Sequence, residues 1–551
     1  MTGGGADLIL HSGQVRTGDG WAEALAIADG VILRLGTDSE VLQLKRDGCR
    51  TVDLRGRVVL PGLHDLHVHP IYAGVRQARC RVPQGSNLEE TLRIVSAAAA
   101  EAKPGEWVLG GQWDASALGG VPHRSMLDSV APDVPVLLED TSGHSSWANS
   151  AALRIAGVTA ETPDPVEGIF ERDEAGEPTG ILRETAAYML ADVAPKPTQA
   201  DVERGLAWAL QQMLAFGITS FTEAALGFTA GARIEMRAYN ALARRDELKQ
   251  RVRISITWEP NDQEQLDVIS KRNFYAHGRM KTDGIKIFLD GVPTDGHTAA
   301  MLQPYADTVE GRDDHVSRHG MLRVDPDLLK AAVARFDREG LTVKFHAAGD
   351  AAVRAGLDAI EFARQQNGDG PQMHNVGHCT FVSKDDIARA RRIGATLEVS
   401  PYLWQPAPIC SDIAAAVGPD LIERVWPVRE MLDGGALVVA GSDWSVVPSV
   451  NPWVGIETLV TREEPGGSAE SFGPSQAITI EEALEIFTIN AARQEGVADR
   501  IGRIEEGLIA DVIVVDQNPL TVPIHRIHAT QVDLTIIDGE IVFDRSLTPQ
   551  I

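Results

Sequence analysis

Residues 61–70, PGLHDLHVHP, place three histidines and one aspartate within ten positions. If the stretch is a β-strand, side chains two residues apart face the same side, so Asp65, His67 and His69 share one face. His64 has the opposite parity and we expect it to be structural, whereas Asp65 would lie deeper and orient a ligating imidazole. The Pro-Gly pair before them predicts where one domain leads into the next. Alone, the motif fits either a metal-binding pair or two unrelated histidines in a polar loop, so the rest of the chain has to decide.

The composition narrows the class of protein. A chain of 551 residues suggests two or three domains, and a formal net charge of −27 argues against nucleic acid or an anionic membrane as a partner. Four cysteines without CxxC spacing predict neither a disulfide framework nor a thiolate zinc site. No stretch approaches the ~20 apolar residues of a membrane span, and the first residues lack a signal-peptide pattern. We therefore expect a soluble, cytoplasmic protein.

The two ends of the chain have the same sequence pattern. DLILHSGQVRT (7–17) and ALAIADGVILRLG (24–36) read as short strands with Gly and Asp turns, and GLIADVIVVDQNP (507–519) and VDLTIIDGEIVFD (532–544) repeat the pattern. Neither end has enough strand to bury a core alone. We predict one small β-sandwich domain built from residues 1–60 and 495–551.

The middle of the chain alternates buried strands with helices. Six apolar runs have the character of strands buried on both faces, at residues 218–224, 284–291, 341–350, 375–382, 395–401 and 436–444. Helical stretches flank the third of them, and such alternation predicts a parallel (β/α)₈ barrel over residues 61–494. A doubly wound open sheet is the competitor, but no Gly-rich phosphate loop follows the first strand. Residues 75–200 are too long for a loop and predict an insertion that covers one mouth of the barrel.

Four polar residues stand at or just past the carboxyl ends of later predicted strands: Lys286, His346, His378 and Asp443. A single buried lysine is unfavourable unless something neutralises it, and a single buried histidine is usually a hydrogen-bonded core residue. These four residues, however, occupy strands four, five, six and eight, and the histidine pair occupies the first strand. The carboxyl ends of all these strands converge on the barrel axis. Their convergence favours a metal site over coincidence.

These residues carry a resemblance to a known family. HxH on the first strand, Lys on the fourth, His on the fifth and sixth and Asp on the eighth resembles the ligand pattern of the amidohydrolase superfamily. HSSWANSAAL (144–153), PTGILRE (178–184), HAAGD (346–350) and GSDWSV (441–446) further resemble its YtcJ-like branch, which includes N-substituted formamide deformylases.

The resemblance implies a metal-dependent hydrolase. It implies that Lys286 is carboxylated by CO₂ and bridges two metals, of which His67, His69 and Asp443 bind the more buried and His346 and His378 the more exposed. One metal instead of two stays open. Imidazole and carboxylate ligands without thiolate suit zinc, with manganese, iron or nickel as alternatives.

The reaction that this implies is hydrolysis of an amide-type C–N bond in a small N-acyl or N-formyl substrate. Asp443 would act as the general base towards water and return the proton to the leaving amine. Esters or lactones are within reach of the same chemistry. A decarboxylase or isomerase on the same metal site is a second hypothesis, and a non-catalytic scaffold a third. Relatives are often dimers, so a homodimer is also open.

Five residues are candidates for contact with the substrate: His144, Trp147, His297, Trp113 and Trp404. Members of the branch commonly carry Arg near the position of His297, so the resemblance alone does not assign their substrates to this chain. Tryptophans near a barrel mouth can form an apolar pocket, although each one singly fits a packing role as well. Asp290 shares the parity of Lys286, and we expect a turn residue or a substrate contact there in preference to a metal ligand.

Overall fold

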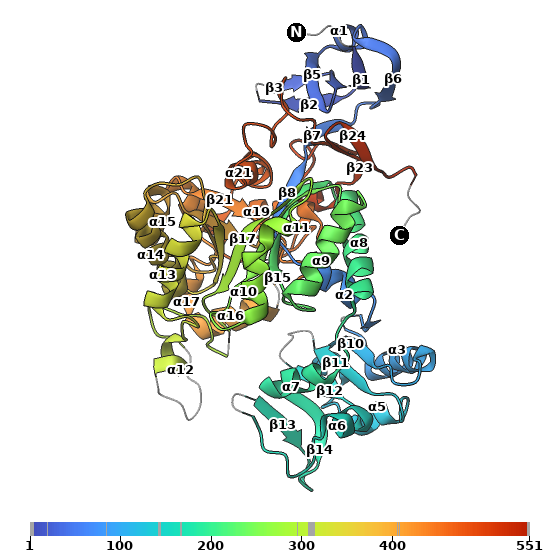
Figure 1. Cartoon of the computed structure of the whole chain (residues 1–551), viewed down its shortest axis with the longest axis vertical. Coiled ribbons are helices and arrows are strands. Elements are labelled where there is room, and N and C mark those ends of the chain that lie inside the picture. The colour runs from blue at the N-terminus through green and yellow to red at the C-terminus, as the bar shows by residue number, and fades with distance from the viewer. Residues whose placement is uncertain are drawn as a thin grey trace. The chain divides into compact units, whose positions relative to one another are not determined.

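A computed structural model shows the architecture of the chain (Figure 1). It describes residues 5–18, 20–83, 85–140, 145–165, 168–294, 296–306, 315–404, 406 and 408–547. The chain divides into two compact units. One joins residues Met1–Pro70 to Ala207–Ile551, and the other spans Ile71–Leu206.

The larger unit contains an eight-stranded parallel sheet rolled into a barrel. Its strands, in spatial order, are β8 (Leu63–Val68), β15 (Ile218–Leu226), β16 (Arg251–Thr257), β17 (Met280–Phe288), β18 (Thr342–Ala347), β19 (Asn375–His378), β20 (Thr396–Val399) and β21 (Leu437–Ala440). All residues of β8, β15, β19 and β20 are buried, as expected for strands covered on both faces. The predicted barrel is confirmed.

The barrel closes between its last and first strands just beyond the regular ladder. The amide of Asp443 donates to the carbonyl of His67, and the amide of His69 donates to that of Trp444, both at 2.7 Å. A Cβ on Gly441 would lie 2.3 Å from the amide nitrogen of His67, so only glycine permits this approach. The seam therefore brings the end of the chain's eighth barrel strand against the histidine motif of the first.

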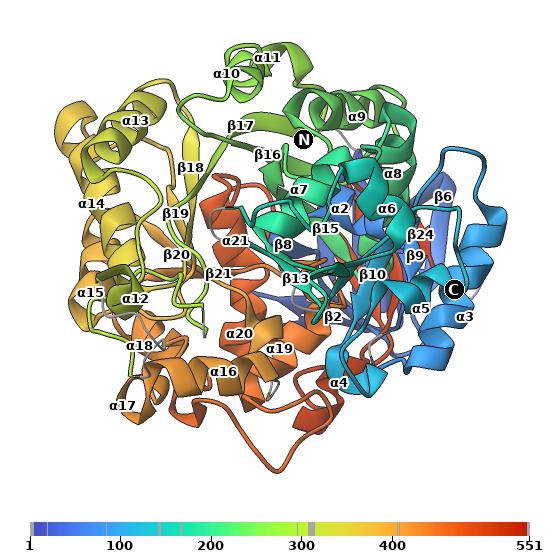
Figure 2. The same cartoon turned by 90° about the horizontal axis from the view of Figure 1, so that it is seen from below.

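Helices surround the barrel. In Figure 2, α13 (Pro326–Arg338), α14 (Asp350–Asn367) and α15 (Lys384–Arg392) lie outside β18, β19 and β20. The caps explain their limits: the Asp325 carboxylate accepts from two amides of the first turn of α13, and α14 ends at Gly368 with φ 80°. The remaining helices of this unit are α1 (Asp38–Leu42), α9 (Ala232–Arg244), α10 (Gln263–Ser270), α11 (Arg272–Tyr275), α12 (His315–His319), α16 (Pro408–Val417), α17 (Pro419–Ile422), α18 (Val428–Asp433), α19 (Pro452–Thr461), α20 (Ile480–Ile486) and α21 (Ile489–Gln494).

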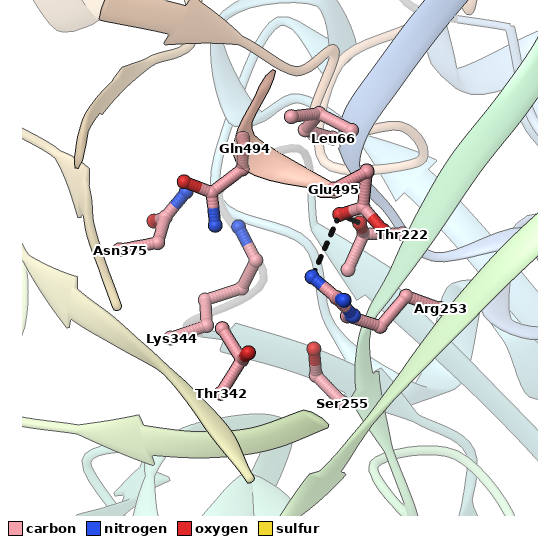
Figure 3. A pocket seen from close by; sticks show the side chains of 9 residues that line it. All are labelled: Leu66, Thr222, Arg253, Ser255, Thr342, Lys344, Asn375, Gln494 and Glu495. Atoms are coloured by element: carbon pink, nitrogen blue, oxygen red, sulfur yellow. Dashed lines mark hydrogen bonds and ion pairs between the residues drawn. The ribbon is translucent and has the colours of Figure 1, made fainter. Parts of the chain in front are cut away.

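Side chains from five barrel strands and the end of α21, all but one of them polar, enclose a small internal cavity (Figure 3). It is lined by Leu66, Thr222, Arg253, Ser255, Thr342, Lys344, Asn375, Gln494 and Glu495. An ion pair between Arg253 and Glu495, at 3.3 Å, crosses one side of it.

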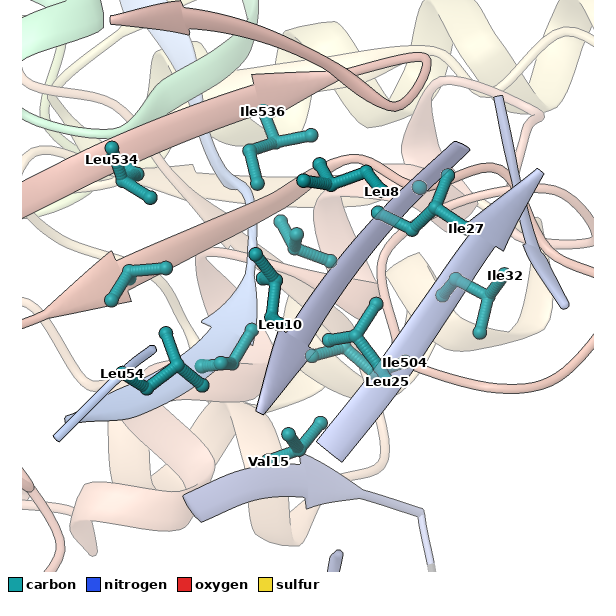
Figure 4. Close-up of a cluster of buried hydrophobic side chains, with 14 residues drawn as sticks. Leu8, Leu10, Val15, Leu25, Ile27, Ile32, Leu54, Ile504, Leu534 and Ile536 are labelled. Carbon is teal, nitrogen blue, oxygen red and sulfur yellow. The ribbon is translucent and has the colours of Figure 1, made fainter. Parts of the chain in front are cut away.

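Strands from both ends of the chain form two sheets packed face to face. One contains β5 (Val31–Gly36), β4 (Ala24–Ala28), β1 (Ala6–His11) and β6 (Lys45–Asp53), and the other β24 (Glu540–Asp544), β23 (Val532–Ile537), β22 (Val512–Val515), β7 (Val58–Pro61), β2 (Gln14–Thr17) and β3 (Gly20–Ala22). Leu8, Leu10 and Ile536 are among the apolar side chains buried between them (Figure 4). The predicted sandwich of terminal strands is confirmed, and β7 leads through Pro61–Gly62 into the barrel.

The unit Ile71–Leu206 has a sheet and cores of its own. Its strands, in spatial order, are β13 (Gly168–Arg172), β14 (Pro178–Glu184), β12 (Ser145–Ala148), β11 (Val136–Asp140), β10 (Val108–Trp113) and β9 (Cys80–Arg81). Its helices are α2 (Pro70–Gln77), α3 (Leu88–Glu101), α4 (Ala115–Leu118), α5 (Arg124–Asp128), α6 (Ser150–Ala156), α7 (Thr185–Val193) and the first half of α8 (Gln199–Ala215). It includes the whole segment 75–200, whose position over the barrel mouth stays a prediction, as do the domain limits.

Within the described ranges, no helix is both long enough and apolar enough to cross a membrane.

Candidate metal centre

The six predicted ligands come from five barrel strands and lie at one end of the barrel. His67 is in β8 and His69 follows it, Lys286 is in β17, His346 is in β18, His378 ends β19, and Asp443 follows β21. All are at or beyond the carboxyl halves of parallel strands, the end where barrel enzymes carry their active sites.

His67, His69 and Asp443 form the tightest group. One ligand atom from each lies within 4.8 Å of the other two. Asp443 Oδ1 is 3.2 Å from His69 Nε2 and 3.7 Å from His67 Nε2. Lys286 Nζ lies 3.5 Å from the same nitrogen of His67. Two imidazole nitrogens and a carboxylate oxygen facing one point are a donor set suited to a divalent metal.

The two later histidines adjoin this group. The ring centroids of His346 and His378 are 4.4 Å apart, and those of His378 and His67 are 4.7 Å apart. His378 Nδ1 lies 4.0 Å from the second carboxylate oxygen of Asp443. His346 donates from Nε2 to the carbonyl of Gly291 at 3.1 Å. The structure thus brings all six predicted residues together, with the three-residue group the most compact.

Burial keeps most of these histidines neutral. It lowers the pKa of His67 and His378 well below the usual value and that of His346 to about 4, and the charge of Lys286 adds to the effect on each. His69 differs, because hydrogen bonds to Asp443 and Glu223 outweigh its burial and raise its pKa to about 9. Neutral imidazole is the form that binds a metal.

The lysine is also perturbed. Burial, followed by the positive charge of Lys344, lowers the pKa of Lys286 to about 7. A substantial share of its side chain is then an uncharged amine near neutral pH, and that is the nucleophilic form.

Two of the ligand candidates have unusual backbone conformations. His378 has φ 65° and Asp443 has φ 60°, in the left-handed region that residues other than glycine rarely occupy. Such strain concentrates at functional sites, where the surrounding structure holds a side chain in a required direction.

Two buried carboxylates support the histidines and were not predicted. Glu398 Oε1 accepts from His67 Nδ1 at 2.5 Å, and Glu223 Oε1 lies 3.7 Å from His69 Nδ1. Tyr239 donates its hydroxyl to Glu223 at 2.8 Å. Both glutamates interrupt apolar strands, in ATLEVSP and ITSFTEA, and that interruption is the signal that could have found them.

The predicted role of Asp65 was wrong. Its carboxylate accepts from the backbone amides of His67 and Ser442, at 3.1 and 2.9 Å, and Glu398 takes the position beside the imidazole of His67. Asp65 therefore ties β8 to the loop after β21. Asp290 is also an anchor, accepting from three backbone amides at 2.8 to 3.0 Å, those of Ala300, Ala348 and Gly349. His64 is buried, in line with the structural role expected for it.

The predicted substrate contacts in the larger unit are buried. His297 stacks on Tyr305 with ring centroids 4.0 Å apart. Trp404 stacks on Trp426, with centroids 5.2 Å apart, while the Arg462 guanidinium lies 4.6 Å from the Trp404 ring. The side chains of His297 and Trp404 are therefore well packed against their neighbours.

In the unit Ile71–Leu206, Trp113 and Trp147 pack edge to face within one apolar core, with centroids 6.2 Å apart. Trp113 donates its indole N–H to the carbonyl of Leu138 at 3.0 Å. His144 lies outside the described residues.

Two phenylalanines lie beside the ligands and were missed. Phe228, just past β15, has its ring 6.2 Å from that of His69 and remains 60% exposed. Phe288, the last residue of β17, has its ring 5.6 Å from His346 and 4.9 Å from Lys286 Nζ. Phe288 lies within a predicted apolar run and Phe228 lies past one, and neither position reveals which ligand candidate the ring adjoins.

The barrel and the histidines at the carboxyl ends of its strands form a candidate metal centre, and comparison with known proteins identifies the family. The amidohydrolase family matches residues 50–543, so the chain belongs to that family. It is 28% identical to the putative amidohydrolase YtcJ of Bacillus subtilis, and 29% identical to the N-substituted formamide deformylase of Arthrobacter pascens. Each match covers 98% of this chain and 99% of the relative. A solved structure titled an uncharacterized metal-dependent hydrolase, from Pyrococcus furiosus, has the same fold with a TM-score of 0.73 at 24% identity, covering 93% of this chain and 100% of that one.

Proposed function

We propose that the protein hydrolyses an amide-type C–N bond of a small N-acyl or N-formyl substrate. The observation that carries the proposal is the convergence of His67, His69 and Asp443 at the carboxyl end of a parallel barrel. The full-length similarity to an N-substituted formamide deformylase supports the choice of bond.

The residues fit a divalent metal. His67 Nε2 and His69 Nε2 both face Asp443 Oδ1, at 3.7 and 3.2 Å. Three borderline donors without thiolate favour zinc, with manganese, iron or nickel as competitors. His346, His378 and Lys286 would hold a second ion, so the proposed content is one or two metals per chain.

Lys286 is the proposed site of carboxylation. Of the two buried lysines inside the barrel, Lys344 is ion-paired with Glu398, whereas Lys286 Nζ lies 3.5 Å from an imidazole nitrogen of His67. Its amine would add to CO₂, releasing one proton and forming a carbamate. The carbamate replaces a cation by an anion with two oxygen ligands.

The catalytic work of the chain falls to Asp443. A divalent metal, when bound, makes water available as hydroxide near neutral pH and polarises the substrate carbonyl. Asp443 accepts the proton of the attacking water and then delivers it to the nitrogen of the leaving amine. The hydrogen bond from its backbone amide to the carbonyl of His67 holds it in place for both transfers.

Phe228 and Phe288, beside His69 and His346, would contact the apolar body of the substrate. The five earlier candidates, His144, Trp147, His297, Trp113 and Trp404, stay predictions.

The test is a hydrolysis screen in ¹⁸O-water. N-formyl, N-acetyl and larger N-acyl amines are compared with esters and lactones, and metal content is measured on the same sample. The proposal predicts turnover of an N-acyl or N-formyl amine with ¹⁸O in the released acid. Turnover restricted to esters or lactones, or a product without label, would contradict it.

A further inference from the structure

Glu398 joins the candidate metal centre to the interior of the barrel. It is fully buried in β20, and its Oε1 accepts from His67 Nδ1 at 2.5 Å. Its other oxygen accepts from Asn375 Nδ2 at 2.8 Å and from the ammonium of Lys344. Both carboxylate oxygens are thus engaged, one by a metal-ligand candidate and one by supporting side chains.

The supporting groups come from neighbouring strands. Lys344 in β18 lies opposite Asn375 in β19, which in turn pairs with Thr396 in β20, two residues before Glu398. Alternate residues of a strand share a face, so these side chains all point into the barrel. Lys344 extends into the internal cavity beside the Arg253–Glu495 ion pair (Figure 3).

Stability alone does not explain the buried Lys344–Glu398 ion pair. A buried ion pair contributes little net stability, because desolvation of both charges offsets their attraction. Apolar residues of similar volume at positions 344 and 398 would fill the same space without that cost. The pair does, however, place a fixed negative charge against one nitrogen of His67.

The negative charge of Glu398 beside Nδ1 determines which tautomer the imidazole of His67 adopts. A neutral imidazole has one N–H and one lone pair. Because Glu398 accepts at Nδ1, the proton sits there, and the lone pair is on Nε2. This nitrogen is the one that faces Asp443 Oδ1 at 3.7 Å and Lys286 Nζ at 3.5 Å.

We propose that Glu398 is a positioning residue that fixes the tautomer and ring orientation of His67, with Lys344 and Asn375 holding its second oxygen. The proposal rests on the metal site proposed above. It makes Glu398 a determinant of metal affinity, although it does not touch the metal.

Glu398→Gln is the direct test. The amide keeps the shape, but its NH₂ group must face either the N–H of His67 or the donors Lys344 and Asn375. Loss of such a carboxylate–imidazole contact costs about 10- to 100-fold in metal affinity. The apparent Zn²⁺ dissociation constant of metal-free protein is measured by competition with a chromogenic chelator, and the visible spectrum of the Co²⁺ form reports its geometry.

Glu495→Gln is the matched control, since Glu495 is a buried carboxylate of the same interior whose partner is Arg253. Glu398→Asp is the second variant, which keeps the charge but withdraws it from His67. Circular dichroism and thermal melting establish that each variant folds.

The expected result is weaker Zn²⁺ binding and an altered Co²⁺ spectrum in both Glu398 variants, with neither change in Glu495→Gln. Folded Glu398 variants with wild-type affinity and spectrum would overturn the positioning role, as would an equal loss in Glu495→Gln. If the wild-type protein itself bound no metal, the proposed function would fail first.

Discussion

Asp443 Oδ1 lies 3.2 Å from His69 Nε2, although the two residues follow the last and the first strands of the barrel. The backbone hydrogen bond from Asp443 to His67 closes the barrel at the same place. The candidate metal centre is therefore built across the seam of the sheet. Any change that opens the seam also separates Asp443 from His67 and His69.

Asp443→Asn tests the proton-transfer role. The amide is nearly the same size but cannot take a proton from water, so kcat should fall by at least about a hundredfold. Stability should change little, because the backbone contacts of residue 443 remain. Steady-state kinetics and thermal melting check the two statements, and an unchanged kcat would remove Asp443 from the reaction.

Lys286→Arg tests the carbamate. Arginine stays charged and cannot react with CO₂, so protein prepared in ¹³C-bicarbonate with metal should show a carbamate carbon by ¹³C NMR in the wild type and none in the variant. Lys281→Met, on the same strand with an exposed side chain, is the control and should keep the signal. A signal that persists in Lys286→Arg would assign the carbamate elsewhere.

The burial of His64, which is not a ligand candidate, predicts that the stability of the fold depends on pH. Burial, then the charge of Arg251, lowers its pKa in the folded protein to about 3, against 6.5 as the ordinary value. Between these two values the unfolded chain binds a proton that the folded protein does not. Its contribution is therefore fully present above pH 6.5 and is lost as the pH falls towards 3.

His64→Asn removes the imidazole that binds this proton in the unfolded chain. Urea unfolding of the metal-free protein between pH 7 and 5 should then show a slope of stability against pH reduced by up to about 1.4 kcal/mol per pH unit. Wild type and variant with the same slope would show that His64 is not buried in its neutral form.

Phe228→Ala tests the apolar contact beside His69. Removing an exposed ring should lower kcat/KM for substrates with a large apolar group by about tenfold, since one apolar contact is worth 1–3 kcal/mol in discrimination. The smallest N-formyl substrate should be almost unaffected. Phe274→Ala, at a still more exposed phenylalanine in α11, is the control. Equal losses for large and small substrates would exclude a role in specificity.

The barrel, the terminal sandwich and the six ligand candidates were predictable because each leaves a periodic or compositional signal. His346 and His378 stand out as polar residues in apolar strands, and parity separates His67 and His69 from His64. The same reasoning overlooked Glu398, whose importance depends on a neighbour 331 positions away. Pairing of that kind follows from strand register around the barrel, which one sequence does not show.

Substrate contacts were harder to predict from the sequence for a related reason. The barrel framework gives the direction of a strand residue, but not the packing of a loop residue such as Trp404 or His297. Trp404 is enclosed by Trp426 and Arg462, which come from later segments. Phe228 lies beside His69 because of a turn whose path has no periodic signature.

We propose that the protein hydrolyses amide-type substrates with a metal held by His67, His69 and Asp443. The most direct measurement is the rate of N-acyl amine hydrolysis by one preparation before chelation, after complete metal removal, and after readdition of Zn²⁺. We predict one to two transition-metal ions per chain at the start, loss of activity with the metal, and recovery on readdition. Undiminished hydrolysis by metal-free protein would contradict it.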